Sequence, residues 1–186
     1  MAKLSCAFFG HKRFNYKPYE DDIYEAVEDL INRGVTEFYN CYSGQFDQTC
    51  ARIVNELKEQ YPHIKNVLVL SYIPDEKFTQ PQIFDKTICL SEQAALYVYD
   101  IAQFNQKIVE TVDYIVCGIS RDNGDAKDAC DYAKQLRVPW FDVVTDEEEF
   151  WTSRTAQDAA QSKAKRKLKD FKEAVWITVA MKKTTD

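Results

Sequence analysis

The chain alternates between short apolar runs and segments in which apolar residues recur every three or four positions. The run over residues 4–9 ends at Gly10 and is typical of a buried strand, whereas the apolar positions from Ile23 to Ile31 follow a helical period. The same alternation predicts five strands, over residues 4–9, 36–42, 66–73, 112–117 and 139–144. It predicts helices from about residue 19 to Gly34 and over 46–57, a helix that begins at Ser91 followed by another through 106–111, and a helix over 125–136.

This order of strands and helices predicts an α/β fold. Parallel neighbouring strands need crossover connections, so five strands separated by helices form a mostly parallel sheet with helices on both faces, three layers in all. The segment 74–90 breaks the pattern with Pro74 and Pro81 and is predicted to be a long loop.

The last part of the chain has a different character. Residues 146–174 are highly charged and predict a long C-terminal helix, while the apolar residues 175–179 fit either its last turn or an edge strand. We therefore expect a domain over 1–145 and a helical extension over 146–186 that packs on the same domain or on a partner subunit.

Composition narrows the functional classes. The 186 residues are 45% hydrophobic and 29% charged, with a net charge of −6, which suits one packed domain and argues against general binding of nucleic acid. No apolar run approaches the roughly 18–20 residues of a membrane span, and no signal peptide is recognisable, so a cytoplasmic protein is predicted. The six cysteines have no CxxC or zinc-type spacing. Reduced thiols are expected, with no metal and no cofactor.

Candidate chemistry follows the strands. The carboxyl ends of parallel strands share one edge of a sheet, and four of the five glycines lie in loops that follow a predicted strand. Glycine lets a backbone approach a ligand, basic side chains bind phosphate, and a helix N-terminus attracts an anion. These residues come from the first two loops: Gly10, His11, Lys12, Arg13, Ser43 and Gly44. Neither a Walker A motif nor GxGxxG is present, so common nucleoside triphosphate and dinucleotide sites are not predicted.

The same loops carry a resemblance. Residues 8–13, Phe-Phe-Gly-His-Lys-Arg, look like the FxGHR element after the first strand of the SLOG superfamily, which includes the DprA/Smf and LOG proteins. Residues 34–47 resemble the "GV..F..G..GGFD" segment of its YpsA-like bacterial branch, and residues 113–134 resemble the branch's distal glycine loop and helix. The likeness covers roughly residues 4–144 and suggests a bacterial or phage protein.

The resemblance implies a Rossmann-like fold that binds nucleotides or nucleotide-derived small molecules. Carried over residue by residue, the implied ligand-binding positions are Gly10, His11, Lys12, Ser43, Gly44, Gln45, Asp47, Asn123 and Gly124. The chain departs from the family where Gln45 and Asn123 replace glycines. An arginine–asparagine pair is reduced to the asparagine, Asn105.

Three functions remain open. The first is a binding module that senses or sequesters a nucleotide-derived small molecule, because the chain lacks the PGGxGTxxE segment of the LOG enzymes and any paired-carboxylate site. The second is a LOG-like hydrolase of an N-glycosidic or phosphate bond, with Asp47 and His11 as the acid–base candidates. The third is a protein or nucleic-acid contact through the basic segment 163–169. The resemblance is compatible with a homodimer, because relatives often dimerise through helices.

Overall fold

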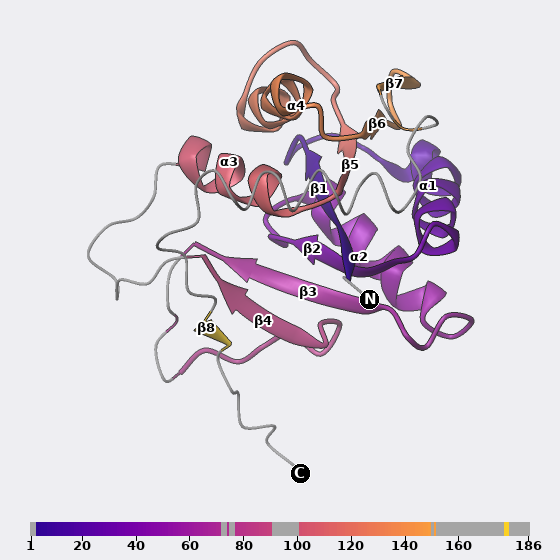
Figure 1. The fold of residues 1–186 in the computed structure, drawn as a ribbon, viewed down its shortest axis with the longest axis vertical. Helices are drawn as coiled ribbons and strands as arrows, with labels where there is room; N and C mark the ends of the chain where they lie inside the picture. Colours follow the sequence, from indigo (N-terminus) through magenta and orange to yellow (C-terminus); the bar gives the residue numbers. More distant parts are fainter. Residues whose placement is uncertain are drawn as a thin grey trace.

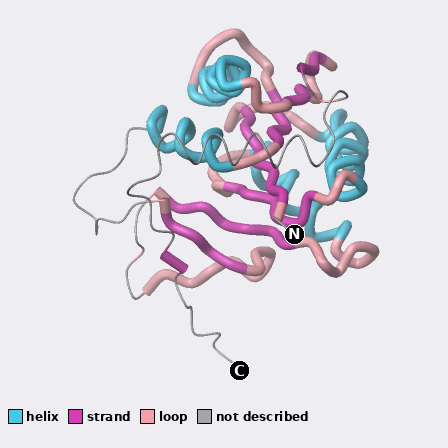
Figure 2. Tube along the Cα trace, in the orientation of Figure 1, coloured by secondary structure: helices cyan, strands magenta, loops and turns pink. Residues whose placement is uncertain are grey.

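One mostly parallel sheet organises the protein. The computed structural model describes residues 3–71, 74, 77–90, 101–149, 151 and 177–178. Within them the strands are β1 (Leu4–Gly10), β2 (Val35–Asn40), β3 (Lys65–Leu70), β4 (Lys86–Cys89), β5 (Tyr114–Gly118), β6 (Trp140–Asp142), β7 (Glu147–Glu149) and β8 (Ile177–Thr178). They form an eight-stranded sheet in the order β7-β6-β5-β1-β2-β3-β4-β8. All neighbours pair in parallel except β7 with β6 and β8 with β4, so the antiparallel strands lie at the two ends of the sheet. Figure 2 shows the strands in magenta.

Helices cover both faces of this sheet (Figure 1). A short 3-10 turn, η1 (Lys17–Tyr19), leads into α1 (Glu20–Asn32), which packs beside α2 (Gln45–Leu57) on one face. The other face carries α3 (Ile101–Thr111) and α4 (Asp125–Leu136). The chain therefore has the three-layer α/β architecture that the sequence predicts.

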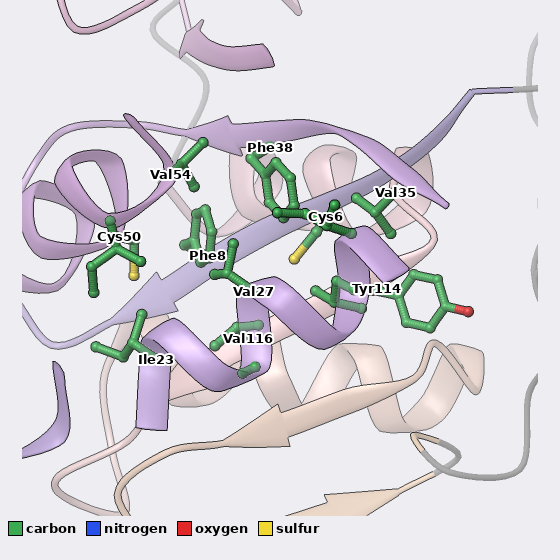
Figure 3. Packing of buried hydrophobic residues seen from close by; sticks show 14 of the residues in the cluster. Cys6, Phe8, Ile23, Val27, Val35, Phe38, Cys50, Val54, Tyr114 and Val116 are labelled. Carbon is green, nitrogen blue, oxygen red and sulfur yellow. The ribbon is translucent and has the colours of Figure 1, made fainter. Parts of the chain in front are cut away.

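The central strand β1 divides the core into two parts. Side chains alternate along a strand, so Cys6 and Phe8 face α1 and α2, whereas Ala7 and Phe9 join the cluster under α3 and α4. Figure 3 shows Cys6 and Phe8 among side chains of α1 and α2, including Ile23. Burial on both faces explains why the apolar run in β1 has no polar interruptions other than the buried Ser5.

The five predicted strands are all present and parallel, and α4 has the predicted bounds of 125–136. Two strands were not predicted, β4 in the expected loop and β7 at the start of the expected C-terminal helix. Residues 86–89 were expected to lie in a loop, but they form β4, which pairs in parallel with β3. A strand of four residues is too short to show a period of apolar positions in the sequence. The segment is a strand because it pairs with β3 in the fold.

The prediction of a helix beginning at residue 146 is wrong at its start. Asp146 adopts a positive φ of 57°, and its N–H donates to the carbonyl of Asp142 at 2.9 Å, which reverses the chain into the antiparallel strand β7. The acidic run over residues 146–149 suits the first turn of a helix, so its composition misled the sequence interpretation. Residues 152–176, which carry the rest of the predicted helix and the basic segment, lie outside the described residues.

After β7, Trp151 packs into the core beneath α1 and β5. The Trp151 ring is buried beside Tyr114 and Phe141, with centroid separations of 5.9 and 5.7 Å, and the Arg33 guanidinium donates to the Trp151 carbonyl. Residues 177–178 pair with β4, which decides in favour of an edge strand for that part of 175–179.

Candidate functional site

Three loops meet at the edge where β1, β2 and β5 end. The His11 N–H donates to the Gly118 carbonyl at 3.3 Å, which joins the loops after β1 and β5. The Gln45 N–H donates to the Lys12 carbonyl at 3.2 Å, which joins the loop after β1 to the start of α2. This edge contains the crevice at which the connections from β1 and β5 diverge, the usual ligand position in open parallel sheets.

His11 fastens two of these loops together. Its side chain is 5% exposed, and Nδ1 accepts the Ser120 N–H at 3.1 Å. An imidazole nitrogen that accepts a backbone N–H carries no proton, so Nε2 holds the proton and donates to the Asn123 carbonyl, 2.9 Å away. Both ring nitrogens are therefore engaged in holding the loop 119–124 against the loop after β1.

Aromatic rings fill the crevice between β1 and β5. A β-carbon at residue 118 would lie 2.6 Å from ring carbons of both Phe46 and Tyr16, and one at residue 10 would overlap the Phe46 ring. The Tyr16 hydroxyl donates to the Gly118 carbonyl at 2.7 Å, and burial raises its pKa, so it stays protonated. Gly10 and Gly118 therefore make room for these rings, a role that the sequence did not indicate.

The turn between β2 and α2 is held by its own side chains. The Asn40 amide donates to the Asp47 carbonyl at 2.6 Å, and its oxygen accepts the Tyr42 N–H at 2.6 Å. The Asp47 carboxylate accepts the N–H and the hydroxyl of Ser43, each at 3.0 Å. Burial raises the pKa of Asp47, while these two hydrogen bonds and the charge of Lys12 oppose the rise.

Tyr42 is the unusual residue of this turn, and the sequence analysis missed it. Its φ of +55° is left-handed, a conformation that costs a non-glycine residue about 1–2 kcal/mol. Tyr42 is 37% exposed, and its ring meets that of Phe84 edge-to-face at 5.2 Å between centroids. A strained backbone that fixes an exposed aromatic ring at the edge of a sheet is typical of a binding position.

A cavity of about 470 Å³ opens beside Tyr42 and Gln45. It continues between the start of α1 and the first turns of α2, where Glu20 and Arg52 form an ion pair at 2.8 Å. The other lining residues are mostly polar: Asn15, Tyr16, Lys17, Gln48, Thr49 and Ile83. Its volume lies within the range of about 300–1,000 Å³ that is usual for sites of small organic ligands.

The remaining predicted residues lie around the same edge. Lys12 and Arg13 are exposed, and a β-carbon at Gly44 would lie 2.7 Å from the Lys12 Cα, which shows how closely the first two loops pack. Gly124 has a φ of +99° and precedes α4. The Asn105 amide donates to the Asp125 carbonyl at 3.4 Å and links α3 to α4.

Two features are absent from the part of the chain that the structure describes. Among the described residues, no three His, Cys, Asp or Glu side chains cluster in a way that could hold a metal ion. None of the helices in the described part of the chain is long and apolar enough to cross a membrane.

The cysteines depart from the prediction of six reduced thiols. Cys117 in β5 and Cys130 in α4 form a disulfide. The other four, Cys6, Cys41, Cys50 and Cys89, form no disulfide. Cys117 and Cys130 are 13 residues apart, so no local motif marks the pair, and they meet only because α4 packs on β5.

No family model matches the sequence, and no curated protein matches it. Solved structures share the fold. DNA processing protein A (DprA) from Streptococcus pneumoniae aligns with a TM-score of 0.54 and 9% identity, over 75% of this chain and 50% of that one. The chain thus spans about half the length of the pneumococcal protein.

Two other structures align over more of their own length. DprA from Helicobacter pylori, whose structure was described for its single-stranded DNA binding, gives a TM-score of 0.54 and 10% identity over 87% of this chain and 73% of that one. The Moco carrier protein from Chlamydomonas reinhardtii gives 0.50 and 13%, over 91% of this chain and 100% of that one. The chain therefore shares a Rossmann-type α/β fold with these proteins. The fold that the resemblance implies is confirmed, and membership of the SLOG superfamily and of its YpsA-like branch stays a prediction.

Proposed function

We propose that the protein binds a nucleotide-derived small molecule at the edge where β1 and β2 end. The observation that carries this proposal is Tyr42, an exposed ring held in a left-handed turn at the mouth of a cavity of about 470 Å³. A planar base stacks on such a ring, and one stacking contact is worth about 1–3 kcal/mol.

The surroundings of Tyr42 suit the rest of a nucleotide. Amide side chains such as Gln45 and Gln48 line the cavity and both donate and accept hydrogen bonds, as the edge of a base requires. The first turn of α2 begins at Gln45, and the exposed Lys12 packs against it. A helix N-terminus next to a lysine favours a phosphate.

A hydrolase is the alternative, and the raised pKa of Asp47 favours it, because a protonated carboxyl can act as a general acid. The geometry supports binding more strongly. One Asp47 oxygen already accepts two hydrogen bonds from Ser43, and both nitrogens of His11 hold the loop 119–124. Incubation with nucleoside monophosphates tests the alternative: release of free base that Asp47→Asn abolishes would favour the hydrolase.

The binding proposal is tested by thermal shift with a library of nucleotides, together with mass spectrometry of any ligand released on denaturation. Tyr42→Asn keeps a residue that tolerates the left-handed turn but removes the ring, and it should weaken binding about 5- to 100-fold. Lys12→Ala should weaken binding of phosphorylated ligands only. Lys65→Ala, an exposed lysine at the start of β3, is the matched control and should bind normally. A library that leaves the melting temperature unchanged, with no ligand released, would contradict the proposal.

A further inference from the structure

The Cys117–Cys130 disulfide encloses the loop after β5. Cys117 is the residue before Gly118, and Cys130 lies in the second turn of α4, so the bond closes a segment that contains the whole of 119–124. This is the segment whose Ser120 and Asn123 are hydrogen-bonded to His11. The disulfide therefore lies where it can control the order of that loop.

A second cavity is lined by Cys130, one of the two cysteines of this disulfide. It has a volume of about 320 Å³, and its walls include Cys130, Trp140 and Thr145. Lys127 and Lys134 line it as well, three residues before and four residues after Cys130, and thus on the same face of α4. Cys117 is fully buried in the core beneath α3 and α4.

We propose that the cavity is a thiol–disulfide exchange site at which a low-molecular-weight thiol attacks Cys130. The incoming thiolate forms a new bond to the Cys130 sulfur and the Cys130–Cys117 bond breaks, so that the electron pair leaves on the Cys117 sulfur, which takes a proton in its apolar surroundings. A second thiolate then attacks the small-molecule sulfur of this mixed disulfide and releases Cys130. In total, two thiols are oxidised to their disulfide and the protein disulfide is reduced to two thiols.

Because the disulfide is buried, only a small thiol can approach it. Cys130 is 2% exposed, so the active-site loop of a protein dithiol has no surface to dock on, whereas a cavity of about 320 Å³ admits a molecule of a few heavy atoms. Reduction removes the covalent link between α4 and β5, so that the loop 119–124 is then held by its hydrogen bonds and by the packing of Ile119 and α4 on the sheet. The exchange site therefore regulates the loop without requiring a ligand at the edge near Tyr42.

The first experiment establishes the bond and the point of attack. Alkylation after unfolding without a reductant should modify four cysteines, and six would overturn the proposal. Partial reduction by 2-mercaptoethanol, quenched with acid, should then trap the mixed disulfide on Cys130, as read by peptide mass spectrometry. A mixed disulfide on Cys117 would contradict the proposed geometry.

The second experiment tests the cavity as the route of entry. Thr145→Trp should slow reduction by 2-mercaptoethanol about 10-fold because the indole occupies the cavity, whereas Gln135→Trp, at an exposed position elsewhere on α4, should not. Equal rates in the two variants would show that reduction occurs through general unfolding.

The third experiment tests the coupling to the loop. Hydrogen exchange should accelerate about 10-fold in residues 119–124 on reduction, while the amides of β2 keep their protection. Unchanged exchange in the loop would overturn the regulatory part of the proposal. All three readouts are independent of nucleotide binding, so they can fail without affecting the proposed function.

Discussion

The imidazole of His11 and the carbonyl oxygen of Asn123 are 2.9 Å apart, although 112 residues separate them in the chain. This contact connects the loop after the central strand β1 to the loop after its neighbour β5. Both residues are predicted from the sequence to be ligand-binding positions. In the structure they bind one another, whereas Lys12, Arg13 and Tyr42 are exposed to solvent.

Replacement of His11 should loosen the edge of the sheet. His11→Ala removes the acceptor for the Ser120 N–H and the donor to the Asn123 carbonyl, which should lower the free energy of unfolding by about 1–3 kcal/mol. Hydrogen exchange should accelerate in residues 119–124. The other histidine, the exposed His63, provides the control, and His63→Ala should change neither quantity. Equal effects of the two substitutions would refute the assigned role of His11.

The close contact of Gly10 with Phe46 predicts a double-mutant cycle. Gly10→Ala places a methyl group in the Phe46 ring and should destabilise the fold by about 1–3 kcal/mol, as measured by urea denaturation. In a Phe46→Leu background the same substitution should cost less, because the smaller side chain leaves space. Additive effects of the two changes would show that the ring does not restrict residue 10.

Glu37 should give the protein an acid-dependent stability. Burial disfavours its charge, but the Lys86 ammonium at 2.9 Å and the Tyr39 hydroxyl at 3.2 Å hold its pKa below the ordinary value. A lowered pKa in the folded state contributes stability above the unfolded pKa of about 4.3, and this stability is lost as the pH falls through the folded value.

The test compares Glu37→Gln with the wild type across pH. The variant should be less stable by about 1–2 kcal/mol at pH 7, and the difference should shrink below about pH 4. Glu25→Gln, at an exposed position of α1, should follow the wild-type curve throughout. A difference that stays constant with pH would contradict the ion pair with Lys86.

The end of α4 offers a stabilising substitution. Arg137 follows the helix in a left-handed conformation with a φ of 55°, and its N–H donates to carbonyls of the last turn. Glycine adopts this conformation without a β-carbon penalty, so Arg137→Gly should raise the free energy of unfolding by about 0.5–1 kcal/mol. Arg137→Ala keeps the penalty and should give no gain. A gain of equal size from alanine would attribute the effect to the removed charge.

Most of the fold could be predicted from the sequence because its signals are local. The apolar runs of β1, β3 and β5 are buried on both faces, and each amphipathic helix shows its stripe within a few turns. The errors occur where the signal is short or ambiguous. Four residues do not show a period, which hid β4, and the run of acids at 146–149 suits a helix start as well as the hairpin strand β7.

The location of the candidate site could be predicted from the sequence, but its detailed structure could not. By itself, the sequence determined that the loops after β1, β2 and β5 share an edge, because parallel strands with crossover helices leave no other arrangement. Only the tertiary structure decided how those loops are used. The Phe46 ring over Gly10, the disulfide between Cys117 and Cys130, and the left-handed turn at Tyr42 depend on side chains and backbone from different elements packing together. Such contacts depend on how elements that are distant in the sequence pack together. The local spacing of apolar residues contains no information about this packing.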